Sequence, residues 1–500
     1  MAIRNIPTFG MPASFRILIA DTADEVDGIL VAEMAHRFVL ARRVTLASGS
    51  TFARPYAKLR VLVSDGFLDL SHVEFRHLDE FMDTEPQSHG SLSREITEAL
   101  FPAKMTRHGT FIPTDTRIPN VVSSHESAIC DSDVVLLGIG ANGHLAFNEP
   151  GTPLHATTNI GALTDSSRSV HRAAFARGGR DVPAFALTAG PATILTGRHL
   201  LLAAKGKAKA AAVAAMLSGP VSSDCPASAI RLHDHATIVL DAEAASTWLA
   251  KPQVKAEALP TEVLSANDLS PAAPVVVIAP HPDDAGISCG GLLASLPTTT
   301  RRVIVTWSTG ERISRTGLSV AEGTALRESE AREEAARLGC EIRFMRSRAY
   351  GLGRIDLDDV ADLRNLLSEI KPAWVFASAR EDSHPTHRLC RVTTDLALTE
   401  YVASGSTVDC WTMEGPWHLL SRNEANALVR IDENASLTKS HAIRAHASQI
   451  ERVPFDRAAE ALERLRAVAF SESHLGGRVS GQFDPDTRLE VFRRVRLTFG

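Results

Sequence analysis

A glycine-rich segment, residues 138–150, places the strongest constraint on how this 500-residue chain can fold. It follows the apolar run 134–137, which has the length and composition of a buried strand. The segment contains two closely spaced glycines, an Asn-Gly turn, His144 and Glu149. A glycine-rich turn at the carboxyl end of a strand is where α/β sheets place ligands, and an imidazole near a carboxylate can move a proton. The segment therefore predicts an α/β domain with a polar site at the end of a strand.

Strand-like and helix-like segments alternate along the whole chain, which favours α/β domains with mainly parallel sheets. The length exceeds that of one ordinary domain. Residues 251–274 contain several prolines and few large apolar side chains, which is a linker composition. We therefore expect two Rossmann-like domains, each a mainly parallel sheet flanked by helices. They are predicted to span residues 1–255 and 273–500, with a linker at 256–272.

The composition narrows the choice of partners and compartment. A net charge of −6 gives no reason to expect nucleic acid or an anionic membrane as a partner. No apolar run reaches the roughly 18 residues typical of a membrane span, and residues 1–15 lack a signal-peptide pattern. The six cysteines are scattered without a C-x-x-C pair, which indicates reduced thiols rather than disulfides. These features predict a cytoplasmic protein.

Two further strand ends in the first half carry polar residues. A strand-like segment, 44–47, is followed by small residues whose backbone N–H groups, at the start of a helix, suit a phosphate. A second strand-like segment, 73–78, ends in Asp79 and Glu80, and an acid at a strand end is a candidate general base. The small residues are Ser48, Gly49, Ser50 and Thr51.

Together these residues resemble the glucosamine-6-phosphate deaminase family over about residues 16–251. The resemblance implies that Asp79 takes the proton from C2 of the opened sugar and that His144 opens the pyranose ring. It implies that Glu149 and Asn142 hold His144. Many members have Asp at the position of Asn142, and Asn keeps the hydrogen bonding without the charge. No metal or cofactor is implied for this half.

The resemblance also implies that Arg172 and Lys209 contact the substrate phosphate, together with residues 48–51. A surface position is the commoner fate of a single basic residue, but the placement relative to the strands favours substrate contact. Allosterically activated members carry basic residues where this chain has Asn159 and Gly161. Activation by N-acetylglucosamine 6-phosphate is therefore not implied.

The second half contains a pattern typical of a metal site. The apolar run 275–278 is followed by His281 and Asp284, and His387 comes about a hundred residues later. Three such ligands suit a zinc ion with one open position, which lowers the pKa of a bound water to about 7. The sequence therefore predicts Zn²⁺ bound by His281, Asp284 and His387.

These residues resemble the LmbE/PIG-L family of N-acetylglucosaminyl deacetylases over about residues 273–494. Asp283 is expected to be the general base that activates the water. His384 is expected to stabilise the oxyanion or protonate the leaving amine. Arg327 and Glu330 are expected to form structural ion pairs.

The two resemblances predict a bifunctional enzyme of amino-sugar catabolism. Its second domain would deacetylate an N-acetylglucosamine derivative, most plausibly the 6-phosphate. Its first domain would convert glucosamine 6-phosphate to fructose 6-phosphate and ammonia. The expected partners are small-molecule amino-sugar phosphates, and a homo-oligomer is compatible with the sequence. Three alternatives stay open: a deacetylase of an unphosphorylated chitin-type sugar or a glucosaminyl conjugate, a sugar-phosphate lactonase in the first half, and a sugar-phosphate-sensing regulator with an inactive deaminase domain.

Overall fold

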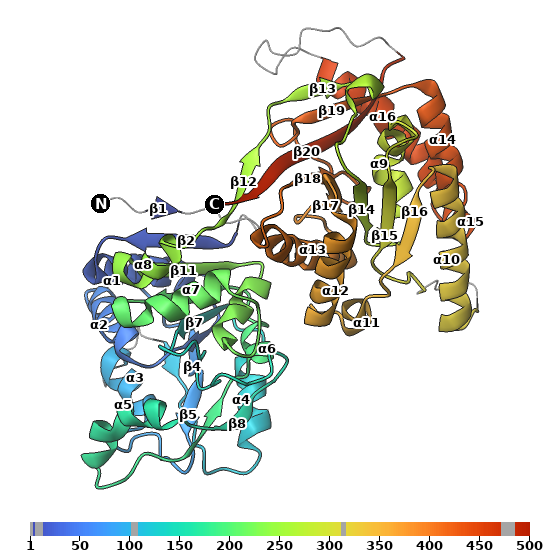
Figure 1. Ribbon diagram of the computed structural model, residues 1–500. Helices are drawn as coiled ribbons and strands as arrows, with labels where there is room; N and C mark the ends of the chain where they lie inside the picture. Colours follow the sequence, from blue (N-terminus) through green and yellow to red (C-terminus); the bar gives the residue numbers. More distant parts are fainter. Residues whose placement is uncertain (1–3, 6–13, 102–108, 312–316, 472–485) are drawn as a thin grey trace. The chain divides into compact units, whose positions relative to one another are not determined.

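The computed structural model describes residues 4–5, 14–101, 109–311, 317–471 and 486–500. The chain forms two compact units, one ending at Pro252 and the other beginning at Gln253. Each is an α/β unit built on a largely parallel sheet, which confirms the predicted fold class (Figure 1). No helix in the described part of the chain combines the length and the hydropathy needed to cross a lipid bilayer.

The first unit contains an eight-stranded sheet in the order β1-β2-β11-β10-β7-β3-β4-β6. All neighbours are parallel except β1 and β2. Its strands are β1 (Arg4–Asn5), β2 (Arg16–Ala20), β3 (Arg43–Leu46), β4 (Glu74–His77), β6 (Thr110–Phe111), β7 (Val134–Gly138), β10 (Leu200–Ala204) and β11 (Ala236–Asp241). A small antiparallel sheet contains β5 (Asp79–Phe81), β9 (Phe185–Thr188) and β8 (Asn159–Ala162).

Helices cover this sheet and bury its central strands. β10 and β11 are buried at every residue, as expected for a parallel sheet covered on both faces. The helices are α1 (Ala23–Phe38), α2 (Ser50–Ser64), α3 (Leu92–Leu100), α4 (Val121–Ile129), α5 (Asp165–Ala176), α6 (Pro191–Ile194), α7 (Ala210–Ser218) and α8 (Ala242–Leu249).

The second unit contains a nine-stranded sheet in the order β13-β19-β20-β18-β17-β14-β15-β16, with β12 also paired to β20. β20 runs antiparallel to its neighbours β12, β18 and β19, whereas β18, β17, β14, β15 and β16 run parallel. The strands are β12 (Val254–Ala258), β13 (Glu262–Leu264), β14 (Val275–Ala279), β15 (Arg302–Thr306), β16 (Glu341–Phe344), β17 (Trp374–Ser378), β18 (Val408–Met413), β19 (Ala427–Ile431) and β20 (Arg488–Phe499). The helices are α9 (Asp284–Ser295), α10 (Val320–Arg337), α11 (Arg348–Leu352), α12 (Leu357–Ile370), α13 (Pro385–Ala403), α14 (Glu433–Ile443), α15 (Ala447–Ile450) and α16 (Phe455–Ser471).

The structure differs from the expected linker at residues 256–272. The end of β12 and all of β13 lie there and pair with β20 and β19, and Pro260 stands in the break between them. Four of the five β12 residues are exposed. A strand held by its backbone, with its side chains in solvent, leaves no apolar pattern in the sequence.

Asp241 joins two segments of the first unit at the end of β11. Its buried carboxylate accepts a hydrogen bond from the backbone N–H of Ala244 at 2.7 Å and so caps α8. The same carboxylate accepts the N–H of Gly206 at 2.9 and 3.0 Å. Gly206 begins the turn that carries Lys209, so this cap also fixes that turn.

Asp241→Ala should destabilise the first unit by about 2–4 kcal/mol. It removes a helix cap, which costs about 0.5–2 kcal/mol, and leaves the N–H of Gly206 without its acceptor, which costs about 1–3 kcal/mol. Thr22 caps only α1, and it is exposed. Thr22→Ala should therefore lower the stability of the first unit by only about 1 kcal/mol. Calorimetric unfolding of the full chain compares the two variants, and equal losses would contradict the double role of Asp241.

Candidate active sites

Four adjacent strands of the first sheet, β10, β7, β3 and β4, are parallel and therefore end at the same edge. The residues that follow these strands line one cavity of about 280 Å³. The expected site residues on its wall are Ser48, Gly49, Ser50, Thr51, Asp79, Asn142, His144 and Lys209.

The loop after β3 presents the start of α2 to the cavity. Gly49 precedes the helix at φ +99°, a left-handed conformation that side chains rarely adopt. Its N–H donates to the Glu95 carboxylate at 2.8 Å. The carbonyl of Thr51 accepts from the Lys205 ammonium at 2.9 Å, and Lys205 pairs with the buried Asp27 at 2.7 Å. The loop is therefore held from two directions.

The two basic residues expected to contact the phosphate, Lys209 and Arg172, lie in different positions relative to the cavity. Lys209 is half-buried on the cavity wall, and burial lowers the pKa of its ammonium. Arg172 is exposed on α5 and is not among the lining residues, whereas its neighbour His171 is. Sequence reasoning missed His171, because a lone histidine on a helix carries no motif.

Asp79 and Glu80 are both buried but have different surroundings. Burial raises the pKa of Asp79 to about 8, with the negative charges of Glu80 and Glu95 adding to the shift. Glu80 instead caps the start of α3, where its carboxylate accepts the backbone N–H groups of Leu92 and Ser93 at 3.0 and 2.9 Å. Only Asp79 faces the cavity.

Glu149 lies behind His144 and orders the turn after β7. Its Oε2 lies 3.6 Å from His144 Nδ1 and accepts from the Asn142 amide at 2.8 Å. The hydroxyls of Ser167 and Thr164 donate to its other oxygen. Burial alone would raise the pKa of Glu149, but these polar contacts outweigh it and hold the value at about 2. Glu149 is therefore a fixed negative charge beside the imidazole.

The glycines of this turn make room for the imidazole. A Cβ on Gly140 would lie 2.3 Å from the His144 ring, so any side chain there would displace the ring. Asn142 Oδ1 also accepts the backbone N–H of His144 at 3.2 Å. The glycine-rich segment thus fixes where His144 points.

Three donor atoms meet at the strand ends of the second unit. His281 Nδ1, Asp284 Oδ2 and His387 Nε2 lie 3.2 Å from one another. The first two follow β14, and His387 lies in the first turn of α13, after β17. Ligands at about 2.0–2.2 Å from a tetrahedral zinc are about 3.3–3.6 Å apart. The donor triangle therefore fits one face of a zinc site.

Asp382 supports this triangle from behind His387. Asp382 Oδ2 lies 2.8 Å from His387 Nδ1, an arrangement typical of metal-ligating histidines. Burial disfavours a charge on His387, but Asp284 and Asp382 outweigh it and raise the pKa to about 10. Sequence reasoning missed Asp382, whose one signal is its position five residues before His387.

The two expected catalytic side chains flank the triangle. Asp283 is buried and pairs with Arg327 at 2.7 Å, while Arg327 also pairs with Glu330 at 3.2 Å. Arg327 is thus in a buried ion pair, and its partner is the candidate base itself. His384 precedes α13, and burial, with the positive charges possible on His281 and His387, lowers its pKa to about 4.

Trp417 closes this site on one side. Its ring centroid lies 5.2 Å from that of His384 and 5.3 Å from that of His387. One nitrogen from each of His281, His384 and His387 lies within 4.8 Å of the other two. The apolar indole therefore borders the polar cluster.

Each unit matches a known protein family. Residues 276–398 match the family model described as GlcNAc-PI de-N-acetylase, and residues 17–239 match that of glucosamine-6-phosphate isomerases/6-phosphogluconolactonase. A glucosamine-6-phosphate deaminase of Exiguobacterium sp. is 34% identical over 261 residues, 50% of this chain and 99% of the relative. The same enzyme of Streptomyces avermitilis is 38% identical over 232 residues, 44% of this chain and 87% of the relative.

A solved monomeric glucosamine-6-phosphate deaminase aligns with 46% of this chain and 99% of its own, at 30% identity and a TM-score of 0.43. The sequence relatives are covered almost from end to end by half of this chain. Through its first unit, the chain belongs to the glucosamine-6-phosphate isomerase/6-phosphogluconolactonase family.

Proposed function

We propose that the chain is a bifunctional amino-sugar enzyme. The first unit would convert glucosamine 6-phosphate to fructose 6-phosphate and ammonia. The second would remove acetate from an N-acetylglucosamine derivative, and its first candidate substrate is N-acetylglucosamine 6-phosphate. The proposal rests on one observation. In each unit, an acid, a histidine and a carboxylate that orients the histidine lie together at the carboxyl edge of the sheet. Amino-sugar phosphates are the proposed small-molecule partners, and the six free cysteines support a reducing, cytoplasmic location.

In the first unit, the phosphate would bind at residues 48–51 and Lys209, where the start of α2 and an ammonium face the cavity. His144, beside the fixed charge of Glu149, would move the proton of the C1 hydroxyl to the ring oxygen, so that the C1–O bond breaks and the sugar opens to its aldehyde. Asp79 would then take the C2 proton and return it to C1. Water would replace the nitrogen at C2, releasing ammonia and leaving the ketose.

In the second unit, His281, Asp284 and His387 would hold zinc, which when bound lowers the pKa of a water and polarises a carbonyl. Asp283, held by Arg327, would take a proton from the attacking water. His384 would donate a hydrogen bond to the developing oxyanion. The C–N bond would break as the proton taken by Asp283 passes to the nitrogen, which gives acetate and the free amine.

One assay tests the whole proposal. The full chain would be incubated with N-acetylglucosamine 6-phosphate, and acetate, ammonia and fructose 6-phosphate would be measured together. Equal amounts of all three products are expected, because the product of the second unit is the substrate of the first. Acetate from unphosphorylated N-acetylglucosamine alone would favour the chitin-type alternative, and hydrolysis of 6-phosphogluconolactone without ammonia release would favour a lactonase.

The first catalytic prediction concerns pH. With a pKa of about 8, Asp79 is protonated at acidic pH and becomes ionised as the pH rises through that value. A base must be ionised to act, so kcat/KM for ammonia release should rise about tenfold per pH unit below pH 8 and level off above it. Asp79→Asn should lower kcat by about 10²–10⁴-fold.

Glu95→Gln is the matched variant for this test. It removes one of the charges that raise the pKa of Asp79 but keeps an oxygen that can accept the Gly49 N–H. The pH profile should therefore move to lower pH while the limiting rate stays near that of the wild type. An unchanged profile would argue against Asp79 as the group that titrates.

The second prediction concerns phosphate recognition. Lys209→Ala should raise KM for glucosamine 6-phosphate about tenfold or more, because a charge-assisted contact is worth about 1.5–3 kcal/mol. Lys207→Ala, two residues away and exposed with its ammonium bonded to Ser246, should leave KM unchanged. The KM of Arg172→Ala tests whether Arg172 also contacts the phosphate. Equal turnover of glucosamine and its phosphate by the wild type would contradict the assignment.

The third prediction concerns the metal. His281→Ala should lose bound zinc in elemental analysis, whereas Asp283→Asn should keep zinc but release no acetate. His441→Ala, an exposed histidine on α14, should keep both zinc and activity. A chelator should stop acetate release but spare ammonia release from glucosamine 6-phosphate. Zinc content in His281→Ala equal to that of the wild type would refute this ligand set.

A further inference from the structure

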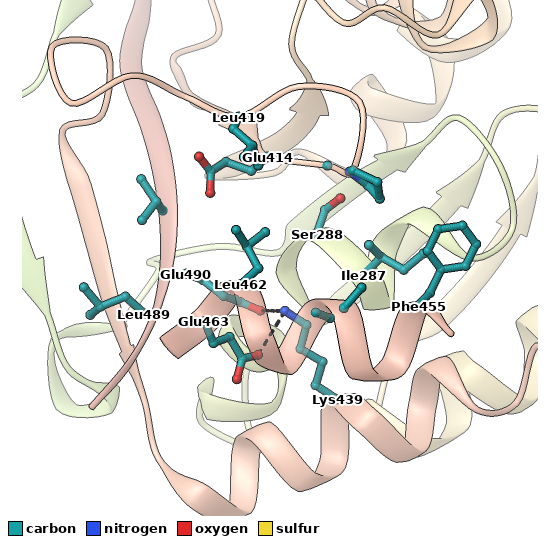
Figure 2. A pocket seen from close by; sticks show the side chains of 15 residues that line it. Ile287, Ser288, Glu414, Leu419, Lys439, Phe455, Leu462, Glu463, Leu489 and Glu490 are labelled. Carbon is teal, nitrogen blue, oxygen red and sulfur yellow. Dashed lines mark hydrogen bonds and ion pairs between the residues drawn. The ribbon is translucent and has the colours of Figure 1, made fainter. Parts of the chain in front are cut away.

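The second unit contains another cavity, of about 280 Å³, outside the residues assigned so far. α9, α16, β20 and the segment 414–419 enclose it. Figure 2 shows Phe455 and Ile287 together on one side, Leu489 opposite, and Glu414 with Leu419 above. An apolar cavity of about 150 Å³ can hold a benzene ring, so this one has room for a substituted ring or a short branched chain.

The floor of the cavity carries a buried ammonium. Lys439 is 4% exposed, and its Nζ lies 2.7 Å from Glu490 and 3.1 Å from Glu463 (Figure 2). Burial opposes the charge on Lys439, but these two carboxylates outweigh it and raise its pKa. An ammonium has three N–H donors and no acceptor. Lys439 donates one hydrogen bond to Glu490 and forms an ion pair with Glu463, which leaves at least one donor for a guest.

The carboxylates around the cavity already have partners. Glu490 accepts the backbone N–H groups of Gly291 and Leu292 at 2.8 and 2.7 Å. Glu463 accepts from the Ser436 hydroxyl at 2.8 Å. Glu414 pairs with Arg466 and accepts the N–H of Leu420. An anionic guest would meet the three carboxylates, and a cationic guest would meet the Lys439 ammonium, so the cavity suits a neutral guest with one hydrogen-bond acceptor.

The fold keeps this arrangement in place through a break in α9. Cys289 has non-helical φ −145° and ψ 19°, and the N–H groups accepted by Glu490 follow directly. A Cβ on Gly290 would lie 2.9 Å from Lys439, and one on Gly291 would lie 2.9 Å from Glu490. Because neither glycine has a side chain, Lys439 and Glu490 can lie close to the backbone of α9 beneath the cavity.

The same cavity adjoins the candidate zinc site through Trp417. Gly415, Pro416 and Leu419 line the cavity, and Trp417 belongs to the same short segment. Its ring contacts His384 and His387 on the metal side and lies 6.1 Å from the ring of Phe455, which lines the cavity. A guest that moves or fixes this segment would act on the surroundings of His384.

We propose that this cavity binds a neutral molecule or group that combines an apolar ring or branched chain with one oxygen acceptor for Lys439. Its binding fixes the Trp417 segment and alters deacetylation at the adjoining site. The first statement is independent of the proposed function, and the second rests on it. The guest is either a separate small molecule or the non-reacting part of the substrate.

Cyclohexanone and methylenecyclohexane test the cavity directly, because they share a shape and differ in the oxygen. Calorimetry on the zinc-loaded full chain should show saturable cyclohexanone binding and about tenfold weaker binding of the alkene, as expected for loss of a hydrogen bond to a charged group. No saturable binding of the ketone would overturn the proposal. Equal binding of both would overturn the role of Lys439.

Two alanines of α16 provide matched variants. Ala458 and Ala461 are both exposed on this helix, but only Ala458 lines the cavity. Ala458→Trp should fill the cavity and weaken cyclohexanone binding at least tenfold, and Ala461→Trp should leave it unchanged. Ala459→Leu, on the same wall, is a second filling variant should Ala458→Trp fold poorly. Unchanged affinity in both filling variants would place the guest elsewhere.

Acetate release then tests the coupling and the source of the guest. For a separate molecule, cyclohexanone should alter kcat or KM for N-acetylglucosamine 6-phosphate in the wild type but not in Ala458→Trp. For a part of the substrate, the cyclohexyl β-glycoside of N-acetylglucosamine should have a several-fold lower KM than the free sugar, and cyclohexanone should compete with it. Ketone binding without either effect would overturn the coupling. Absence of any acetate release would instead refute the proposed function and leave the calorimetric result standing.

Discussion

Both candidate sites depend on the parallel alignment of the central strands. Parallel neighbours end at one edge of a sheet, so residues far apart in the sequence meet there. In the first unit, this brings Ser48, Asp79, His144 and Lys209 to one cavity from four adjacent strands. In the second, β14 and β17 are neighbours, which explains how His281 meets His387 across more than a hundred residues. The register of backbone hydrogen bonds therefore sets the geometry of the chemistry.

The two candidate sites treat buried charge in different ways. In the first, Asp79 is buried near the acids Glu80 and Glu95, and its pKa rises into the range where a base can exchange protons near neutral pH. In the second unit, buried charges form ion pairs: Asp283 pairs with Arg327, and Lys439 pairs with Glu463 and Glu490. Pairing of this kind offsets desolvation and fixes direction. The first site therefore depends on the protonation of Asp79, whereas the second depends on ion pairs of fixed geometry.

The sequence predicted the elements and residues that have local patterns, and missed those that depend on the tertiary fold. The strands at 134–138, 200–204 and 275–279 are apolar runs, and the polar residues after them identified the sheet edges. Asp382, the Arg327–Asp283 pair and strand β12 have no such pattern, because partners distant in the sequence define them. Arg172 shows a different limit. On α5, Ser166, Ser167, Val170 and His171 line the cavity, and Arg172 lies about 100° beyond the edge of this helix face.

The antiparallel strand β20 has a consequence for synthesis of the chain. Its twelve residues pair with β12, the first strand of the second unit, and with β18 and β19. β20 follows all of these strands in the chain, so a ribosome must deliver it before the middle of that sheet can close. The strands of the first unit are complete by Asp241 and have no such dependence. The first unit can therefore fold while the second is still being translated, and the exposed edges of β18 and β19 are the surfaces that a nascent chain would have to protect.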